Sequence, residues 1–457
     1  MTTLEHLEIV LRETQPLRYP RGKRLPLYLW PLRGTPPLND HDLIDALREL
    51  DARGISLLAQ WSIGEQQEAS LAAALRLGRI QRDLGLAIGA DCVAPLYPFY
   101  NGDPATAHID SAGAYFYDES FGKSIPMGCP FTLGPRYAAI RGQVESFAQA
   151  YHEAGLPFGF AFSDWEVDGP LEWNDAWAHS KRCVRCRAEM PDIADFNAFQ
   201  SRLRQLRGEM QHACYAEPLL SRFPHALVGN YAVYPHNGNR YWYDYFERFN
   251  PELPHQFDQH EPQRPWAEEF SFTGYTFAMP VMYTWYRTYD WYDYSPDYRW
   301  FYNMLKVASN AGASAPTNLP IISFVHHTLT DPPATGPGHV IGMSAWAYCE
   351  LLWHSLLRRH STFFLWCPDN EVAHEAGLLH QVWAEALQYR AFLDEGEPIS
   401  FAVPREEGVV VSGLHLGGQV LVRRSDFSSA REPVTIQVAG QPLRVPAQCD
   451  TCQILTL

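Results

Sequence analysis

Residues 158–169, FGFAFSDWEVDG, begin as an apolar run and end in three carboxylates. Such an apolar run favours a buried strand, and charges that follow it are costly to bury unless they are paired or used in chemistry. Asp164 and Glu166 are two residues apart, so on a strand their side chains point to the same face. A close carboxylate pair pushes its two pKa values apart, which suits acid/base chemistry. The alternative interpretation is a strand that runs into a solvated acidic loop.

This stretch is one of eight predicted strands that alternate with helices along the chain. The strands are expected at residues 25–31, 55–61, 86–93, 158–163, 226–234, 275–285, 319–325 and 361–367. Segments with helical apolar spacing, often with a capping residue before them or a glycine after them, are expected at 39–54, 65–84, 137–154, 192–217, 300–311, 344–360 and 374–393. Eight strand–helix repeats predict an α/β fold, a (β/α)8 TIM barrel.

The pattern changes after Glu397. Short alternating apolar segments separated by Gly and Pro turns follow, as in the runs at 408–412, 419–424 and 434–438. These segments predict a small C-terminal β-sandwich. We therefore expect two domains, a catalytic barrel over 1–397 and a β-sandwich over 398–457.

Composition narrows the range of functions. The chain has 457 residues, of which 46% are hydrophobic, and a net charge of −16. The hydrophobic content supports a large core, while the negative charge argues against binding nucleic acid or anionic membranes. The N-terminus lacks the apolar region of a signal peptide, and no apolar run is long enough to span a bilayer. We therefore expect a cytoplasmic protein.

The predicted strands end in polar or aromatic residues, and barrel enzymes carry their sites at the carboxyl ends of the strands. Aromatic residues make up 14% of the chain, and those in loop-like stretches suit the stacking of sugar rings. We therefore predict a carbohydrate substrate. The predicted substrate-binding residues are Trp61, Tyr97, Asn230, Tyr234, Tyr283, Trp285, His326, Trp366 and Asp369.

The run Ser163-Asp164-Trp165-Glu166 resembles the D-W-E at the end of strand four in hyaluronidases and the last D-x-E of the chitinase-type motif. The resemblance implies a glycoside hydrolase in which Glu166 protonates the leaving oxygen. It also implies that Asp164 orients the 2-acetamido group of the substrate and that Tyr283 assists.

The chain departs from that pattern at two places. Phe158, Phe160 and Phe162 stand where chitinases carry aspartates, and Thr284 stands where they carry Asp after the tyrosine. A mechanism with two carboxylates is therefore an alternative. Glu166 would then pair with another acid, for which the candidates are Asp290, Asp293, Asp369 and Glu371, and the carboxylate separation would decide between retention and inversion.

The nine cysteines include two C-x-x-C pairs, Cys183/Cys186 and Cys449/Cys452. Together the pairs have the ligand count of a zinc site, but they lie far apart in the chain and no histidine completes either. Ordinary thiols or a local disulfide are favoured, so neither a metal nor a cofactor is predicted. Two other functions stay open: an inactive carbohydrate-binding barrel, and a metal-dependent hydrolase that uses His326, His327 and Asp331.

Overall fold

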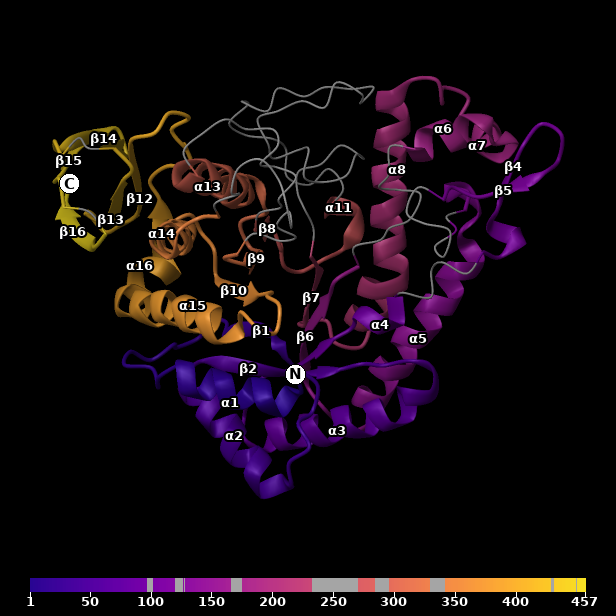
Figure 1. The fold of residues 1–457 in the computed structure, drawn as a ribbon, viewed down its shortest axis with the longest axis horizontal. Helices are drawn as coiled ribbons and strands as arrows, with labels where there is room; N and C mark the ends of the chain where they lie inside the picture. The colour runs from indigo at the N-terminus through magenta and orange to yellow at the C-terminus, as the bar shows by residue number, and fades with distance from the viewer. Residues whose placement is uncertain are drawn as a thin grey trace. The chain divides into compact units, whose positions relative to one another are not determined.

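The computed structural model describes residues 1–96, 102–119, 126, 128–165, 175–231, 270–283, 296–328, 342–428, 431–448 and 450–457 (Figure 1). The chain forms two compact units. Among the described residues, the first unit comprises 1–57 and 278–457, and the second comprises 58–231 and 270–277. Within the described part of the chain, no helix is both long enough and apolar enough to cross a bilayer.

Eight short parallel strands follow the chain at the places where the sequence predicts them. They are β1 (Leu27–Arg33), β2 (Ile55–Gln60), β3 (Ile88–Asp91), β6 (Phe158–Ser163), β7 (Leu227–Asn230), β8 (Val281–Met282), β9 (Ile322–Val325) and β10 (Thr362–Leu365). Their order is β7-β6-β3-β2-β1-β10-β9-β8. Read as a cycle, this is the strand order of a (β/α)8 barrel, so the predicted fold class is confirmed.

Helices follow most of these strands. The longer ones are α1 (Thr3–Glu13), α2 (Asp40–Ala52), α3 (Gln67–Asp83), α5 (Gly134–Glu153), α8 (Phe196–Gln211), α13 (Pro296–Ser314), α14 (Ala345–Leu356) and α15 (Val372–Ala386). The shorter ones are α4 (Val93–Leu96), α6 (Asp175–Arg182), α7 (Val184–Glu189), α9 (Glu217–Leu220), α11 (Phe270–Thr273) and α16 (Arg390–Glu395). A π-helix, His212–Ala216, joins α8 to α9, so the single helix predicted over 192–217 is three segments.

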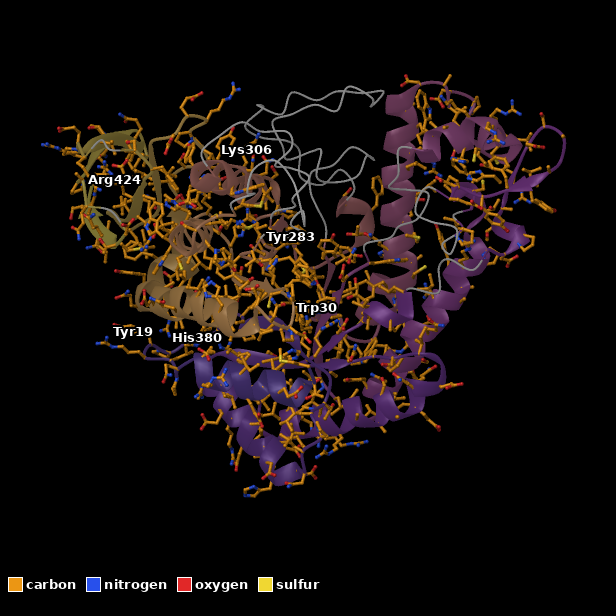
Figure 2. All side chains as sticks on the ribbon, viewed as in Figure 1. Tyr19, Trp30, Tyr283, Lys306, His380 and Arg424 are labelled. Carbon is orange, nitrogen blue, oxygen red and sulfur yellow. The ribbon has the colours of Figure 1, made fainter. Side chains whose placement is uncertain are left out.

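Local sequence explains where helices begin. Asn39 caps α2 because its side-chain oxygen accepts a hydrogen bond from the backbone N–H of Asp42. Thr2 and Glu5 form a reciprocal capping box at the start of α1. In the first unit, α15 is tied to the end of α2 because His380, labelled in Figure 2, lies 3.1 Å from the carbonyl oxygen of Arg53.

The C-terminal part of the first unit is antiparallel. One sheet has the order β11-β12-β13-β16, formed by β11 (Glu397–Pro398), β12 (Val409–Leu416), β13 (Gln419–Asp426) and β16 (Cys452–Thr456). The second sheet pairs β14 (Val434–Val438) with β15 (Gln441–Val445). A cluster of buried side chains from β13, β14 and β15 fills the space between the two sheets, as expected for the predicted β-sandwich.

Candidate functional site

The fourth barrel strand, β6, brings the acidic segment to the carboxyl end of the sheet. Its residues Phe160, Ala161 and Phe162 are buried, as the apolar pattern predicts. After Ser163 the side chains alternate, so that Asp164 is partly exposed while the ring of Trp165 is buried. Glu166, the predicted acid, lies outside the described residues, and so do Tyr97, Tyr234 and Trp285.

Asn230, at the end of β7, holds the backbone at this point. Its Oδ1 accepts hydrogen bonds from Ser163 Oγ at 3.0 Å and from the backbone N–H of Trp165 at 2.8 Å. Its Nδ2 donates to the carbonyl of Trp165 at 3.4 Å. The side chain is only 4% exposed. Asn230 is therefore placed to position the end of the fourth strand, while its predicted contact with a sugar stays a prediction.

A buried acid, Asp91, ends the neighbouring strand β3. Its carboxylate accepts a hydrogen bond from the backbone N–H of Val93 at 3.0 Å, and in the parallel register it lies opposite Phe162. The sequence did not single out Asp91, although an acid that ends an apolar run is the same signal that identified Asp164. Asp91 is therefore a further carboxylate at the carboxyl ends of the second unit's strands.

In the first unit, the end of β9 is organised by a buried acid on α15. His326 Nδ1 lies 2.7 Å from Glu375 Oε1, and both side chains are buried. The other carboxylate oxygen accepts a hydrogen bond from the backbone N–H of His327 at 2.9 Å. Thr328 Oγ1 lies 3.1 Å from His326 Nε2. The Glu375 carboxylate thereby fixes the orientation of the His326 imidazole.

His327 faces a different environment. Its Nε2 lies 2.8 Å from the carbonyl oxygen of Met343, and its Nδ1 lies 3.2 Å from Nε2 of His374. Burial lowers the pKa of His327, so its imidazole is neutral near pH 7. The two histidines that follow β9 therefore have different partners, because neighbouring side chains on an extended segment point to opposite sides.

An aromatic surface lies beside His326. The rings of Tyr283 and Trp366 stack at 5.5 Å, and His326 meets Trp366 edge-on at 5.0 Å. Trp366 and Trp30 are partly exposed, whereas Tyr283 is 7% exposed and His326 is 1% exposed. Figure 2 locates Trp30 and Tyr283. Trp366 is therefore the member of this group with a ring open to a ligand, while Tyr283 and His326 support it.

Two further predicted substrate contacts have other partners. Trp61 is 1% exposed, and its ring stacks on Phe147 of α5 at 4.7 Å and on Phe158 at 5.6 Å. Trp61 therefore packs in the core of the second unit, and its predicted contact with substrate stays a prediction. Asp369 is exposed and lies 3.1 Å from His6 Nε2. A hydrogen bond from the N-terminal ammonium lowers the pKa of the Asp369 carboxyl.

The two C-x-x-C pairs of the sequence lie in different surroundings. Cys183 and Cys186 lie with Cys129 and His108 in the second unit, and all four side chains are buried. Cys452 lies in β16, where its sulfur is 3.8 Å from an Arg423 nitrogen, and Cys449 lies outside the described residues. All the described cysteines are free thiols, which is one of the two alternatives that the sequence leaves open.

No family model matches the sequence, and no curated protein matches it. Several solved glycosidases are similar to this chain at low identity. An α-L-fucosidase from Paenibacillus thiaminolyticus is 11% identical over 82% of this chain and 51% of its own, with a TM-score of 0.45. A family 36 α-galactosidase from Geobacillus stearothermophilus is 10% identical over 99% and 57%, with a TM-score of 0.44.

A β-galactosidase from Halorubrum lacusprofundi is 11% identical over 81% of this chain and 59% of its own, with a TM-score of 0.47. The chain thus spans little more than half the length of these three enzymes. At these identities the likeness concerns the fold alone, and the role of each residue has to be argued from this chain.

Proposed function

We propose that this protein is a glycoside hydrolase that cleaves a glycosidic bond of an oligo- or polysaccharide, with Glu166 as the general acid. The supporting observation is the attachment of Ser163 and Trp165 to Asn230, which holds the start of the D-W-E sequence at the carboxyl end of the fourth barrel strand. Barrel enzymes carry catalytic residues at such strand ends.

The chemistry follows from the spacing of the two acids. Asp164 is partly exposed and lies two residues before Glu166 in the sequence. A carboxylate close to a general acid favours the protonated form of that acid near neutral pH, and this is the effect proposed for Asp164 on Glu166. Asp164 then either orients a 2-acetamido group, as the resemblance to hyaluronidases and chitinases implies, or stabilises positive charge on the sugar ring in a two-carboxylate mechanism.

The test is a leaving-group series on Glu166→Gln. We expect hydrolysis of alkyl and weakly activated aryl glycosides to fall by about 10²–10⁴-fold, because the departing oxygen loses its proton donor. Dinitrophenyl glycosides, whose leaving group needs no proton, should lose far less. The substrate panel includes glycosides of 2-acetamido and of 2-hydroxy sugars. The rates of Asp164→Asn on the two kinds of sugar, measured in the same series, distinguish the two roles proposed for Asp164.

An exposed acid on α2 gives the control, since Asp45→Asn should leave every rate unchanged. Wild-type activity in Glu166→Gln would rule out Glu166 as the acid. An equal loss for all leaving groups would show that Glu166 acts in another role.

The partly exposed Trp366 on Tyr283 favours a second candidate, a barrel that binds carbohydrate without cleaving it. In that case the wild-type protein would bind oligosaccharides in calorimetry but release no product from any member of the panel. The metal-dependent hydrolase has less support, because among the described residues His326 is oriented by Glu375 and His327 by Met343 and His374.

A further inference from the structure

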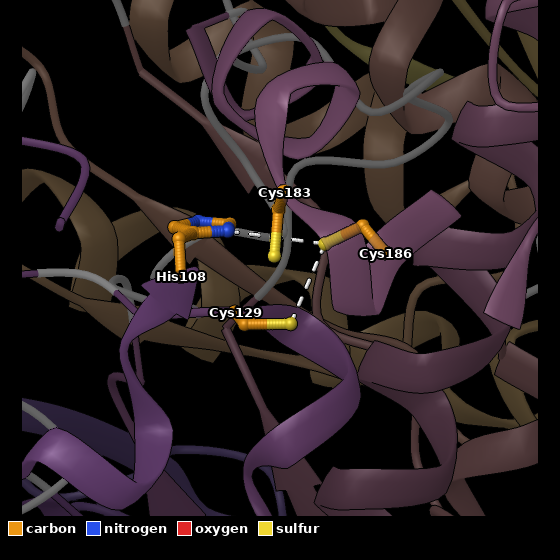
Figure 3. Close-up of side chains that lie close together, drawn as sticks. All are labelled: His108, Cys129, Cys183 and Cys186. Carbon is orange, nitrogen blue, oxygen red and sulfur yellow. Dashed lines mark hydrogen bonds between the residues drawn. The ribbon is translucent and has the colours of Figure 1, made fainter. Parts of the chain in front are cut away.

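Four metal-ligating side chains from three separate segments meet in the second unit. His108 lies in β4 (His108–Ile109), Cys129 precedes a short 3-10 helix, and Cys183 and Cys186 lie at the start of α7. Their ligating atoms all lie within 4.8 Å of one another, and all four residues are buried. Figure 3 shows the imidazole and the three sulfurs pointing toward a common centre.

We propose that His108, Cys129, Cys183 and Cys186 bind one Zn²⁺ ion in a closed tetrahedral site. Cys129 Sγ lies 3.4 Å from Cys186 Sγ, and His108 Nδ1 lies 3.8 Å from Cys186 Sγ. For Zn–S bonds of about 2.3 Å, tetrahedral geometry places two sulfurs about 3.8 Å apart. The spacing of the side chains is therefore that of ligands around a shared ion.

The chemistry of the donor set points to the same metal. Three thiolates and one imidazole are soft and borderline ligands, which suit zinc far better than magnesium or calcium. Four protein ligands close the coordination sphere and leave no position for water or substrate. The site is therefore structural, and it is separate from the chemistry proposed for Glu166.

A disulfide explains the cluster less well. Cys129 Sγ and Cys186 Sγ are 3.4 Å apart, whereas a disulfide bond is about 2.05 Å long. Joining Cys129 to Cys186 would also leave the Cys183 thiol and the His108 imidazole buried beside the bond. His108 turns Nδ1 toward the sulfurs, while Nε2 has no hydrogen-bond partner among the described residues.

The surrounding chain is built to hold the four ligands. The backbone N–H of Ile109 donates to Cys183 Sγ at 3.5 Å, a contact that stabilises a thiolate. Arg185, between the two cysteines of the C-x-x-C pair, donates to the carbonyls of Ala105 and Ala107 at 3.0 and 2.9 Å. These bonds join the start of α7 to the segment that carries His108.

The loop that carries Cys129 is held just as closely. The N–H of Cys129 donates to the carbonyl of Thr106 at 2.7 Å. At Gly128 an added Cβ would come within 2.1 Å of the same oxygen, so only glycine allows this approach. The ion would thus tie the long insertion after β3 to the helices that follow β6, the strand that leads to Asp164.

Metal analysis of the wild-type protein, purified without chelators, is the first test. We expect about one zinc per chain, and X-ray absorption should show sulfur at about 2.3 Å and nitrogen at about 2.0–2.1 Å. Exchange with Co²⁺ should give the visible bands of tetrahedral thiolate coordination. A folded, reduced protein that contains no zinc and takes up neither Zn²⁺ nor Co²⁺ would overturn the proposal.

Substitutions then identify the ligands. Cys183→Ser and His108→Ala should each lower the zinc content well below one per chain, whereas Cys214→Ser, at a buried thiol of the same unit outside the cluster, should retain it. Full zinc in Cys183→Ser or His108→Ala would contradict the assignment of that ligand.

Differential alkylation covers the case in which the variants fail to fold, because it uses the wild-type chain. With zinc bound, Cys129, Cys183 and Cys186 should resist iodoacetamide, and a chelator should expose these three together while circular dichroism reports the fold. Labelling of the three at the same rate with and without the chelator would overturn the proposal, as would a disulfide among them found by mass spectrometry.

Discussion

Asn230 shows how one amide can order a segment far from it in sequence. Its side chain forms hydrogen bonds with the Ser163 hydroxyl and with both the N–H and the carbonyl of Trp165, just after β6. Buried polar groups left without partners cost about 1–3 kcal/mol each. The orientation of Asp164, and of the chain that continues from it, therefore depends on a side chain from the next strand.

We expect Asn230→Ala to lower the free energy of unfolding by about 1–3 kcal/mol, because the N–H of Trp165 loses its acceptor in a buried position. The catalytic rate should fall more than the affinity for substrate, since Asn230 acts by positioning the acid segment. Urea unfolding and kcat against KM measure the two effects. Asn318→Ala, at an exposed asparagine, is the control, and equal stability of the two variants would contradict the positioning role.

The sequence suggests candidate residues where residues close together in the chain carry the pattern. The D-W-E run and the aromatic strand ends can be seen in one short window. Glu375 could not be found in that way, because it contacts His326 and His327 from a helix and only the fold brings them together. The proposed zinc site also depends on the fold. Its C-x-x-C pair can be seen in the sequence, but His108 and Cys129 come from the insertion after β3.

At the scale of elements, periodicity predicted the strands and helices well because each buries a regular face. The sixth strand is the weakest case. The sequence predicted 275–285, and within the described residues 275–283 the strand covers Val281–Met282, with an isolated bridge at Ala278. Pro280 explains the break, because proline has no N–H to donate to a neighbouring strand. Its carbonyl still accepts a hydrogen bond from the N–H of Phe324.

His360 connects several elements of the first unit. It follows α14, its Nδ1 contacts the Ser323 hydroxyl of β9, and its Nε2 lies 2.9 Å from the carbonyl oxygen of Ala308 on α13. Burial lowers the pKa of His360 to about 4, from an ordinary value of 6.5. The folded protein therefore holds this imidazole neutral in a range where the unfolded chain protonates it.

The sign of the pH effect follows from that difference. Below pH 6.5 the unfolded chain binds the proton first, so stability falls as the pH drops from about 6.5 to about 4. At about 1.4 kcal/mol per pKa unit, His360 accounts for about 3 kcal/mol of this loss. Urea unfolding between pH 7 and pH 4 should therefore show a weaker pH dependence for His360→Gln than for the wild type. His41→Gln, at a largely exposed histidine, should leave the dependence unchanged.

At the scale of the whole molecule, the β-sandwich shares a buried polar network with α14 inside the first unit. Arg423 of β13 donates to Glu350 at 2.9 Å through Nε, and a second guanidinium nitrogen contacts the same carboxylate. His354 lies 2.7 Å from Ser412 Oγ and 2.8 Å from Ser425 Oγ. The sequence pattern changes from long helical segments to short alternating segments at Glu397. It does not indicate that a charged residue on a barrel helix pairs with a residue on the C-terminal strands.

We therefore expect the fragment 1–397 not to fold alone, because it would lose the partners of Glu350 and His354 and expose the apolar cluster around Leu357 and Phe392. Soluble expression and thermal unfolding of 1–397 and 1–457 measure this.

Arg423→Ala tests the same contact in the full chain. It should lower the free energy of unfolding by about 3–5 kcal/mol, because it leaves the Glu350 carboxylate buried without its cation. Arg444→Ala, on the exposed side of β15, should cost about 0.5 kcal/mol or less. A soluble 1–397 that unfolds cooperatively at the temperature of the full chain would show instead that the barrel is an independent domain.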